Sequence, residues 1–260
     1  AGKGVKQMYK IQGATHKGML REHNEDRYTG CMLSEDYGYA LVCDGMGGEN
    51  GGSVASTTAC EEIRRLMESS YRTDLTQSSI YMILEAALEA ANTAIFLRAA
   101  QEPDLSGMGT TVSLAVVSGS HCYIANVGDS RAYLLHNETL TQLTVDHTHV
   151  QSLIDKGEIT PEEAKTHPKR HYLTRAVGVS AQISPSFAET ELATGDVLLL
   201  CSDGLYNMVD DATLIRLLHR VRDGEDPSIL IDEANRLGGL DNITAMATIN
   251  VGKGVERLDG

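Results

Sequence analysis

Short apolar runs alternate with Gly- and Asp-containing turns along much of the chain, and this pattern predicts β-strands. The run Tyr37-Gly-Tyr-Ala-Leu-Val-Cys43 stops at the Gly-rich stretch Asp44-Gly-Met-Gly-Gly48, which favours a buried strand followed by a turn. Further strands are predicted over residues 110–117, 121–127, 131–135, 183–192, 197–201 and 243–251. The turns at 118–120 and 128–130 predict a meander of the first three of these strands, with Asp129 in a hairpin turn.

Longer segments carry apolar residues at i, i+3, i+4 and i+7, a spacing that predicts helices. One helix is predicted over residues 53–68, with Ser53 as its N-cap, and a longer one over residues 75–100. Shorter helices are predicted over residues 212–221 and 227–237. Because the strands cluster as hairpins and the helices occur in groups, the pattern favours an antiparallel sheet core covered by helices over alternating βαβ units.

A single domain accounts for most of the chain. With 260 residues, 42% of them hydrophobic, the chain is long enough to bury a sizeable core, and no linker or repeat divides it. We predict one domain over residues 11–251, an N-terminal extension over 1–10 and a C-terminal tail over 252–260. Residues 146–180 are polar and rich in His, so we expect a surface flap there.

Composition and charge exclude several kinds of partner. The formal net charge is -14, which disfavours binding to nucleic acid or to an anionic membrane. No uninterrupted apolar run approaches the roughly 20 residues that span a bilayer, and residues 1–6 lack the apolar stretch of a signal peptide. The five widely spaced cysteines are typical of reduced thiols. We therefore expect a cytoplasmic protein with no nucleic-acid or membrane partner, and a monomer.

Several aspartates stand at the ends of predicted strands. Asp44 directly follows one predicted strand, Asp203 comes shortly after another, and Asp241 shortly precedes the last one. We therefore expect the three aspartates to meet at one sheet edge. Their mutual repulsion would raise their pKa values unless hard divalent cations were bound there. Two such ions, about 3.5–4 Å apart, activate water for attack on phosphorus. Turn propensity also explains any single Asp-Gly pair, so the strand ends by themselves leave both interpretations open.

Six short motifs carry a family resemblance. They are Arg21-Glu-His-Asn-Glu-Asp26, Asp44-Gly-Met-Gly-Gly48, Gly107-Met-Gly-Thr-Thr111, Gly128-Asp-Ser-Arg131, Ser202-Asp-Gly204 and Asp241-Asn-Ile-Thr244. In this order and spacing they resemble the bacterial branch of the PPM (type 2C) metal-dependent Ser/Thr protein phosphatases, over roughly residues 11–251. The resemblance implies an α+β fold: a four-layer αββα sandwich of two central antiparallel β-sheets flanked by helix pairs, with the metal centre at one end.

The resemblance also implies an activity and a set of metal ligands. The activity is hydrolysis of phosphoserine and phosphothreonine in proteins, in one step, by a hydroxide that bridges two Mn²⁺ or Mg²⁺ ions. Asp44 would bridge the two ions and position the nucleophilic water. Asp203 and Asp241 would complete the protein ligands of the first ion, and the carbonyl of Gly45 would bind the second.

The other implied roles concern the second ion, a third ion and the phosphate. Glu25 and Asp26 would hold the second ion's waters or contact the ion, and Asp129, with Asp203, would match a third, weaker metal site. Arg21 matches the family's phosphate-binding arginine, a role that suits a planar, permanently charged guanidinium. Met46 stands where eukaryotic relatives place a proton-donating His; a thioether has no proton to give, so water or another side chain must protonate the leaving group.

The implied partners are phosphoprotein substrates, including a cognate Ser/Thr kinase. Two alternatives share the fold: a catalytically silent module that binds phosphoproteins, and a phosphatase of a sigma-factor regulator. The first would normally lack some of the metal aspartates, and the second usually has extra sensory domains and a shorter flap. This chain keeps every one of those aspartates and has a long flap, which favours the protein phosphatase.

Overall fold

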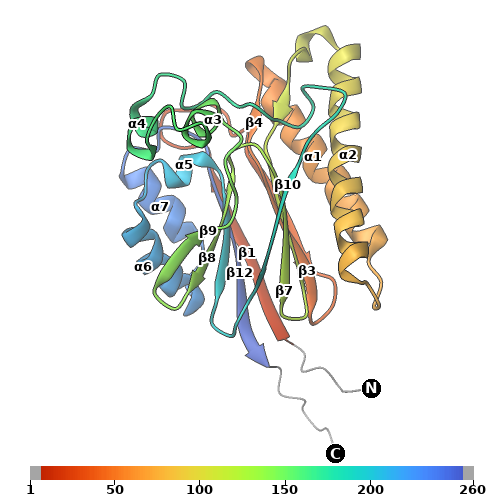
Figure 1. Cartoon of the computed structure of the whole chain (residues 1–260), viewed down its shortest axis with the longest axis vertical. Coiled ribbons are helices and arrows are strands. Elements are labelled where there is room, and N and C mark those ends of the chain that lie inside the picture. Colours follow the sequence, from red (N-terminus) through yellow and green to blue (C-terminus); the bar gives the residue numbers. More distant parts are fainter. Residues whose placement is uncertain (1–6, 254–260) are drawn as a thin grey trace, which may run out of the picture.

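The computed structural model describes residues 7–253, with the side chains of all of these except residues 7, 48–50 and 253. Two five-stranded antiparallel sheets pack face to face, and helices cover their outer faces (Figure 1). The four layers confirm the predicted α+β sandwich of two central sheets flanked by helix pairs.

Each sheet combines strands from distant parts of the chain. The first sheet contains, in spatial order, β1 (Gln7–His16), β12 (Ile243–Lys253), β11 (Val197–Cys201), β8 (Arg131–His136) and β9 (Thr139–Gln142). The second contains β10 (Ser186–Glu191), β7 (His121–Val127), β6 (Val112–Ser118), β3 (Tyr37–Cys43) and β2 (Arg27–Met32). A two-residue ladder joins β4 (Gly45–Met46) to β5 (Gly109–Thr110).

Two pairs of helices form the outer layers. The helices α1 (Gly48–Ser70) and α2 (Gln77–Gln101) cover the second sheet, and α6 (Asp211–Arg222) and α7 (Ser228–Arg236) cover the first (Figure 1). The expected flap contains α3 (His149–Asp155) and α4 (Pro161–Thr166). A single turn, α5 (Asp203–Tyr206), follows β11, and a short 3₁₀ turn (Pro103–Leu105) follows α2.

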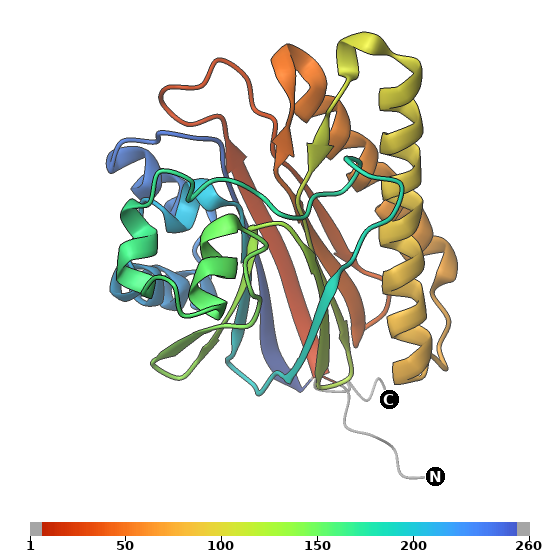
Figure 2. The same cartoon turned by 45° about the horizontal axis from the view of Figure 1, so that its top comes forward.

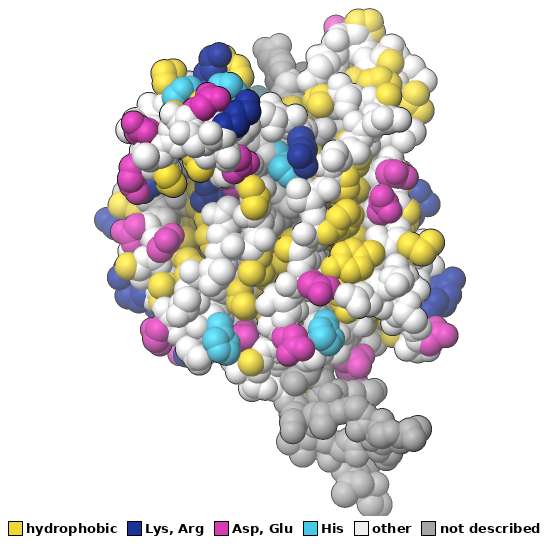
Figure 3. Space-filling view, in the orientation of Figure 1, with side chains coloured by type: hydrophobic (Ala, Val, Ile, Leu, Met, Phe, Trp, Pro, Cys, Tyr) yellow, Lys and Arg dark blue, Asp and Glu magenta, His cyan; other side chains and the backbone are white. Residues whose placement is uncertain are grey.

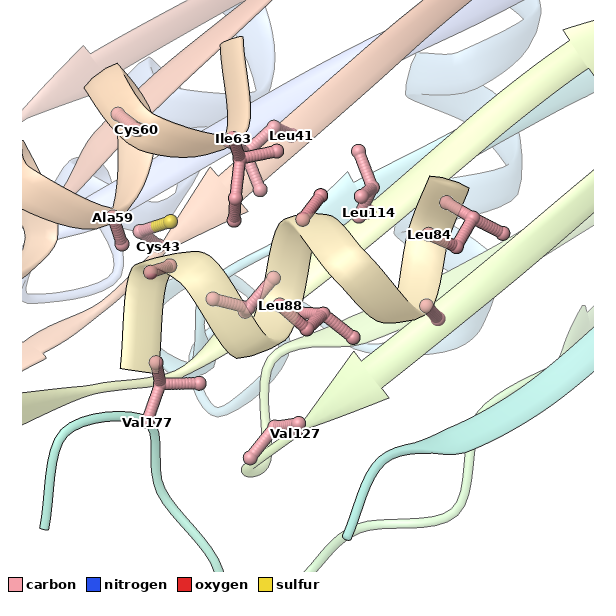
Figure 4. Packing of buried hydrophobic residues seen from close by; sticks show 14 of the residues in the cluster. Leu41, Cys43, Ala59, Cys60, Ile63, Leu84, Leu88, Leu114, Val127 and Val177 are labelled. Carbon is pink, nitrogen blue, oxygen red and sulfur yellow. The ribbon is translucent and has the colours of Figure 1, made fainter. Parts of the chain in front are cut away.

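Three apolar clusters fill the spaces between the layers. One lies between α1, α2 and the second sheet, where Leu84 and Leu88 of α2 pack with Ile63 of α1 and Leu114 of β6 (Figure 4). A second joins the first sheet to α6 and α7, and a third lies between the two sheets. By length and composition alone α2 is apolar enough to cross a membrane, a test that core helices also pass. Seven of its residues are buried, as in a core helix.

The predicted N-terminal extension over residues 1–10 overlaps strand β1. That strand begins at Gln7 and pairs with β12 as far as Lys253, so residues 7–10 belong to the first sheet. Tyr9 is buried and donates its hydroxyl hydrogen to the carbonyl of Gly119 at 2.8 Å, which explains why the sheet extends this far. The rest of the predicted extension and tail, residues 1–6 and 254–260, lies outside the described residues.

The predicted start of the first helix at Ser53 is wrong. Helix α1 begins at Gly48, and the Ser53 hydroxyl accepts a hydrogen bond from Arg27 Nη2 at 2.9 Å instead of capping the helix. The Gly-rich sequence is typical of a turn, but here it permits close packing. A Cβ at Gly52 would lie 2.8 Å from the backbone carbonyl carbon of Gly45, so the helix can start beside this segment only with glycine at this position.

The predicted meander is also wrong, because β8 does not pair with β7. Strands β6 and β7 pair in the second sheet, whereas β8 pairs with β11 and β9 in the first. Tyr133 and Leu135 of β8 pack into the cluster under α6 and α7, and this burial holds β8 in the first sheet. Residues 128–130 therefore cross from one sheet to the other, and Asp129 lies in that crossing rather than in a hairpin turn.

Candidate metal centre

The strand-end aspartates gather at one end of the sandwich. Asp44 follows β3 of the second sheet, while Asp203 follows β11 and Asp241 precedes β12 in the first. Since β11 and β12 are antiparallel neighbours, the end of one lies beside the start of the other. The aspartates thus come from both sheets, and not from one sheet edge as the strand pattern alone predicted. Figure 1 shows β4 and α5, the elements next to Asp44 and Asp203, at this end.

Backbone hydrogen bonds fix the position of Asp44. Its N–H donates to Thr111 Oγ1 at 2.9 Å, and its carbonyl accepts from the Thr111 N–H and from Thr110 Oγ1, both at 2.8 Å. Burial, followed by the negative charges of Asp26 and Asp203, raises the pKa of Asp44 well above its usual range. The fold therefore holds this carboxyl among like charges, an arrangement that a bound cation would relieve.

Asp26 is fully buried and oriented by two hydroxyl groups. Its Oδ2 accepts hydrogen bonds from Ser202 Oγ and Thr244 Oγ1, each at 2.7 Å. Within residues 7–253 its Oδ1 has no hydrogen-bond donor, although it is buried. Burial raises the pKa of Asp26 to about 6, and the two hydroxyl donors act in the opposite direction. A buried carboxylate oxygen without a donor needs a ligand, and a cation would satisfy it.

Asp203 and Asp129 complete the group of carboxylates; Asp129 is buried, and the Asp203 side chain is 14% exposed. Burial, followed by the charge of Asp129, raises the pKa of Asp203 well above its usual range. Burial, followed by the charge of Asp146, raises the pKa of Asp129 to about 6. Asp203 Oδ2 accepts a hydrogen bond from Asn207 at 3.1 Å and lies 3.8 Å from Nδ1 of the flap residue His171. We call the four carboxylates Asp26, Asp44, Asp129 and Asp203 the site floor.

An aromatic and a guanidinium group support Asp129 from below. Tyr206, at the end of α5, donates its hydroxyl hydrogen to the carbonyl of Asp129 at 2.9 Å. The Arg131 guanidinium lies 3.7 Å from the centre of the Tyr206 ring and binds both carboxylate oxygens of Asp146, at 2.7 to 3.2 Å. Helix α5, the crossing between the sheets and the start of the flap are therefore held together by one stacked ion pair.

His147 is a structural residue that the sequence did not reveal. Its Nδ1 accepts the Gly128 N–H at 3.1 Å, so the ring proton is on Nε2, which lies 2.8 Å from Ser186 Oγ. Burial, with a smaller contribution from the Arg175 charge, lowers the pKa of His147 to about 4. This neutral imidazole fixes the crossing that carries Asp129. The many histidines around residues 147–171 indicated a solvated flap, and nothing in that pattern distinguishes the buried one.

Glu25 and Gly45 are packed against each other at the edge of the floor. The Glu25 N–H donates to Asn242 Oδ1 at 2.8 Å, and burial raises the pKa of the Glu25 carboxyl. A Cβ on Gly45 would lie 2.1 Å from the Gly52 carbonyl oxygen and 2.7 Å from that of Glu25, so no other residue fits. Asn242, Ser202 and Thr244 were not predicted as site residues, yet each stands inside or beside a motif, and that adjacency is the signal that reveals them.

Arg21 and Asp241 lie on the exposed side of the site. Arg21 Nη2 binds Asp241 Oδ2 at 2.7 Å, and the two side chains are 53% and 36% exposed. Arg21 lies in the connection between β1 and β2, and Asp241 in the connection between α7 and β12. We call these two residues the site rim. The guanidinium expected to bind phosphate therefore pairs here with a carboxylate expected to bind metal.

The donor set fits divalent cations, although no ligand cage is preformed. In the described part of the chain, no three Asp, Glu, His or Cys side chains are already arranged to hold an ion. Asp241 pairs with Arg21, and Asp26 accepts from two hydroxyl groups, so protein donors engage some of the oxygens. The remaining features are oxygen donors only, strong mutual repulsion and one buried oxygen without a donor, all of which favour a hard divalent cation. The ligand role of each residue stays a prediction.

Fold and site together define an αββα sandwich protein with a cluster of carboxylate oxygen donors at one end. Residues 13–229 match the family model of protein phosphatase 2C, so the chain belongs to the protein phosphatase 2C family, which is metal-dependent. Serine/threonine phosphatase stp of Listeria innocua is 41% identical over 235 residues, which cover 89% of this chain and 92% of that protein.

Solved structures agree with this family. Serine/threonine phosphatase Stp1 from Staphylococcus aureus superposes with a TM-score of 0.86 at 32% identity, covering 96% of this chain and 98% of that one. The catalytic domain of PstP, solved in complex with two manganese ions, superposes with a TM-score of 0.80 at 35% identity, covering 94% of this chain and 98% of that one.

Proposed function

We propose that this protein removes phosphate from phosphoserine and phosphothreonine in proteins, using divalent cations bound at the site floor. The observation that carries the proposal is the group of like-charged, largely buried carboxylates contributed by both sheets, which raise one another's pKa values. Relatives named Ser/Thr phosphatases align with 89% of the chain, which supports the same activity here.

The residues of the site divide the work of such a reaction. We propose that Asp44, Asp203 and Asp241 with the Gly45 carbonyl hold two Mn²⁺ or Mg²⁺ ions, with Glu25 and Asp26 beside the second, and Asp129 at a third, weaker site. Bound ions of this kind lower the pKa of water and neutralise charge on a phosphoryl group. PstP, crystallised with two manganese ions, supports two ions and manganese.

Arg21 is placed to exchange its Asp241 carboxylate partner for the phosphate of a substrate. Its guanidinium is exposed and pairs with Asp241 in the structure. A cation bound at Asp241 would offset the carboxylate charge and weaken that pair, leaving the guanidinium to bind two phosphate oxygens. Met46 offers no proton, so solvent or another side chain protonates the leaving group.

We further propose a cytoplasmic monomer that acts on phosphoproteins, a cognate Ser/Thr kinase among them. All five cysteines are free thiols, and four of them are buried, which supports a reducing compartment. The net charge of -14 supports a protein without nucleic-acid partners.

Metal removal tests the proposed function directly. The protein would be stripped with a chelator and assayed with p-nitrophenyl phosphate and with phosphothreonine, phosphoserine and phosphotyrosine peptides. We expect turnover to disappear without metal and to return on addition of Mn²⁺ or Mg²⁺, with the phosphotyrosine peptide the poorest substrate. Turnover that persists after complete chelation, or a preference for phosphotyrosine, would contradict the proposal.

A further inference from the structure

Exposed apolar side chains are concentrated beside the site rim. Among the described residues thirteen large apolar side chains are exposed, and four of them fall on two connections of the chain: Met19 and Leu20 between β1 and β2, and Leu237 and Leu240 between α7 and β12. Their exposed fractions run from 42% to 68%. Single exposed apolar residues are common, but a group at one place marks an interaction site. We call these four residues the apolar rim patch.

The two connections that carry the patch are joined to each other. The β1–β2 and α7–β12 connections lie at the same end of the molecule (Figure 2). The Met19 N–H donates to the Gly239 carbonyl at 2.7 Å. Met19 Cγ lies 2.8 Å from the position that a Cβ on Gly239 would occupy, and Leu240 Cδ2 lies 3.7 Å from the corresponding position at Gly238. The side chains of Met19 and Leu240 therefore flank the same pair of glycines, of which Gly238 is exposed and Gly239 is buried.

The patch is continuous with the catalytic end of the molecule. Leu20 directly precedes Arg21, and Leu240 directly precedes Asp241, the two residues whose side chains meet at 2.7 Å. Consecutive Cα atoms are 3.8 Å apart, and an extended peptide advances roughly 3.3–3.6 Å per residue. A phosphorylated segment with its phosphate at Arg21 therefore has its residues one to three positions away within reach of the patch.

The charge of the protein indicates what this surface binds. Figure 3 shows acidic side chains spread over the face it presents, and the net charge is -14, so long-range attraction for a phosphoprotein is weak. In the rim itself, the Arg21 guanidinium pairs with the Asp241 carboxylate. Apolar contact is a source of affinity beside the phosphate that is insensitive to the acidity of the protein.

We propose that the apolar rim patch binds an apolar side chain of the substrate, located within about three residues of the phosphoserine or phosphothreonine. The inference rests on the proposed function and deepens it, because it names a feature of the substrates: an apolar residue flanking the phosphorylated one. The contact is made in the enzyme–substrate complex, so it lowers KM more than it raises kcat.

Two phosphothreonine peptides test this inference. They would differ only at the two positions on each side of the phosphothreonine, which are Leu in one and Ser in the other. The protein would be compared with the double variant Met19→Ser/Leu240→Ser, using the ratio of kcat/KM for the two peptides. That ratio cancels any change at the metal centre itself. We expect the unmodified protein to prefer the Leu peptide about tenfold through KM, and the double variant to show a ratio near one.

A matched control comes from the outer face of α2. Met82 and Leu97 are 70% and 52% exposed, so Met82→Ser/Leu97→Ser makes the same two exchanges at a place far from the rim in sequence. This variant should keep the tenfold preference. Circular dichroism and thermal unfolding would check that both double variants fold like the unmodified protein.

Four results would overturn the inference. The first is an unmodified protein that prefers neither peptide, and the second is a rim variant that keeps the preference. The third is a preference that the rim variant keeps and that is abolished by Tyr172→Ser in the flap, where Tyr172 is 62% exposed. A dimer in solution that Met19→Ser/Leu240→Ser dissociates would likewise assign the patch to a second copy of the chain. Failure of the proposed function is distinguishable, because it would remove metal-dependent turnover of p-nitrophenyl phosphate as well.

Discussion

The floor and the rim of the candidate metal centre lie side by side but are built differently. Each floor carboxylate adjoins a strand end or the crossing between the sheets and is largely buried: Asp26 is 0% exposed and accepts from two hydroxyl groups, and the Asp203 side chain is 14% exposed. The rim residues Arg21 and Asp241 lie on two surface connections and are 53% and 36% exposed. The floor is positioned by the fold, whereas the rim is positioned by two loops tied to each other.

Because of this difference, the floor affects the folding stability of the protein, whereas the rim affects substrate recognition. Gathering buried like charges costs folding free energy in the metal-free protein, since burial and repulsion raise the pKa values of the floor carboxyls. The packing of the sheets must offset that cost, and bound cations would stabilise the folded protein by reducing the repulsion. Rim residues are largely solvated, so they can change with the substrate at little cost to the fold. Changes to the floor should therefore alter both stability and activity, while changes to the rim should alter activity alone.

The largest effect is expected from Asp44→Asn in the floor. Because burial and neighbouring aspartates raise the pKa of Asp44, its charged form destabilises the metal-free protein at neutral pH, and an amide relieves that repulsion. We expect the metal-free variant to unfold at a higher urea concentration than the unmodified protein. At the same time kcat/KM should fall by about 10³-fold, more than the 10–100-fold typical of residues that only orient a metal ligand.

Asp74→Asn is the matched control for this prediction. Asp74 is exposed on the connection between α1 and α2, so its amide should change neither stability nor turnover. Urea unfolding with and without Mn²⁺ would measure both parts, since the metal should stabilise the unmodified protein and the control but not Asp44→Asn. A less stable metal-free Asp44→Asn, or one that retains full activity, would contradict the description of the floor.

The second effect concerns His147, which holds the crossing beneath the floor. Its pKa is lowered from 6.5 to about 4 by burial and by Arg175, with Asp146 acting in the opposite direction. Between these pH values the unfolded chain binds a proton that the folded protein does not, so the folded state loses stability as the pH falls from 6.5 to 4. The loss attributable to this residue is about 3 kcal/mol at pH 4, from the 1.36 kcal/mol that corresponds to one pKa unit.

His147→Asn isolates that contribution. The amide oxygen can accept the Gly128 N–H as Nδ1 does, but it does not titrate in this range. The free energy of unfolding of the unmodified protein should therefore decline more steeply than that of the variant between pH 6.5 and 4. The floor carboxyls affect both proteins alike, so the difference belongs to residue 147. The exposed His121→Asn provides the control, and parallel curves for His147→Asn and the unmodified protein would refute the assignment.

The sequence predicted those parts of the fold that are buried on both sides. Strands β3, β7 and β11 coincide with the predicted ranges because each is an almost continuous apolar run that stops at a turn residue. Strands β1, β2 and β9 are not evident in the sequence because most of their positions are exposed or only partly buried and many carry polar residues, so no run or strict alternation is visible. The crossing at residues 128–130 looks like a hairpin turn, and only the packing of Tyr133 and Leu135 shows otherwise.

The candidate site likewise has a part that the sequence predicts and a part that only the tertiary structure shows. The floor aspartates were found because a strand end is visible in sequence and because the motifs follow in order. What supports them is tertiary: His147 reaches Gly128 across 19 positions, and Ser202 and Thr244 reach Asp26 across 176 and 218. Neither a periodicity nor a propensity records such contacts, so the sequence showed the charges of the floor but not the hydrogen bonds that hold them.

The smallest effect is expected from Arg21→Ala in the rim, and it is the sharpest test of the separation. The exposed pair with Asp241 contributes about 0–1 kcal/mol to folding, so urea unfolding should barely change. Hydrogen bonds to a charged group contribute roughly 1.5–3 kcal/mol, so loss of the guanidinium from the bound phosphate should lower kcat/KM about 10–100-fold, mainly through KM. Arg21→Lys should recover part of the loss, since it keeps the charge without the bidentate geometry.

Metal binding distinguishes this explanation from damage to the floor. Removing Arg21 frees a carboxylate oxygen of Asp241, so Mn²⁺ affinity measured by calorimetry should stay the same or rise. The control is Arg65→Ala, which breaks an exposed Arg–Glu pair of similar length on α1, at 2.6 Å, and should leave both kinetics and metal binding unchanged. If Arg21→Ala instead lowered metal affinity and stability together, rim and floor would be one cooperative unit, and the substrate contacts of the rim could not vary independently of the fold.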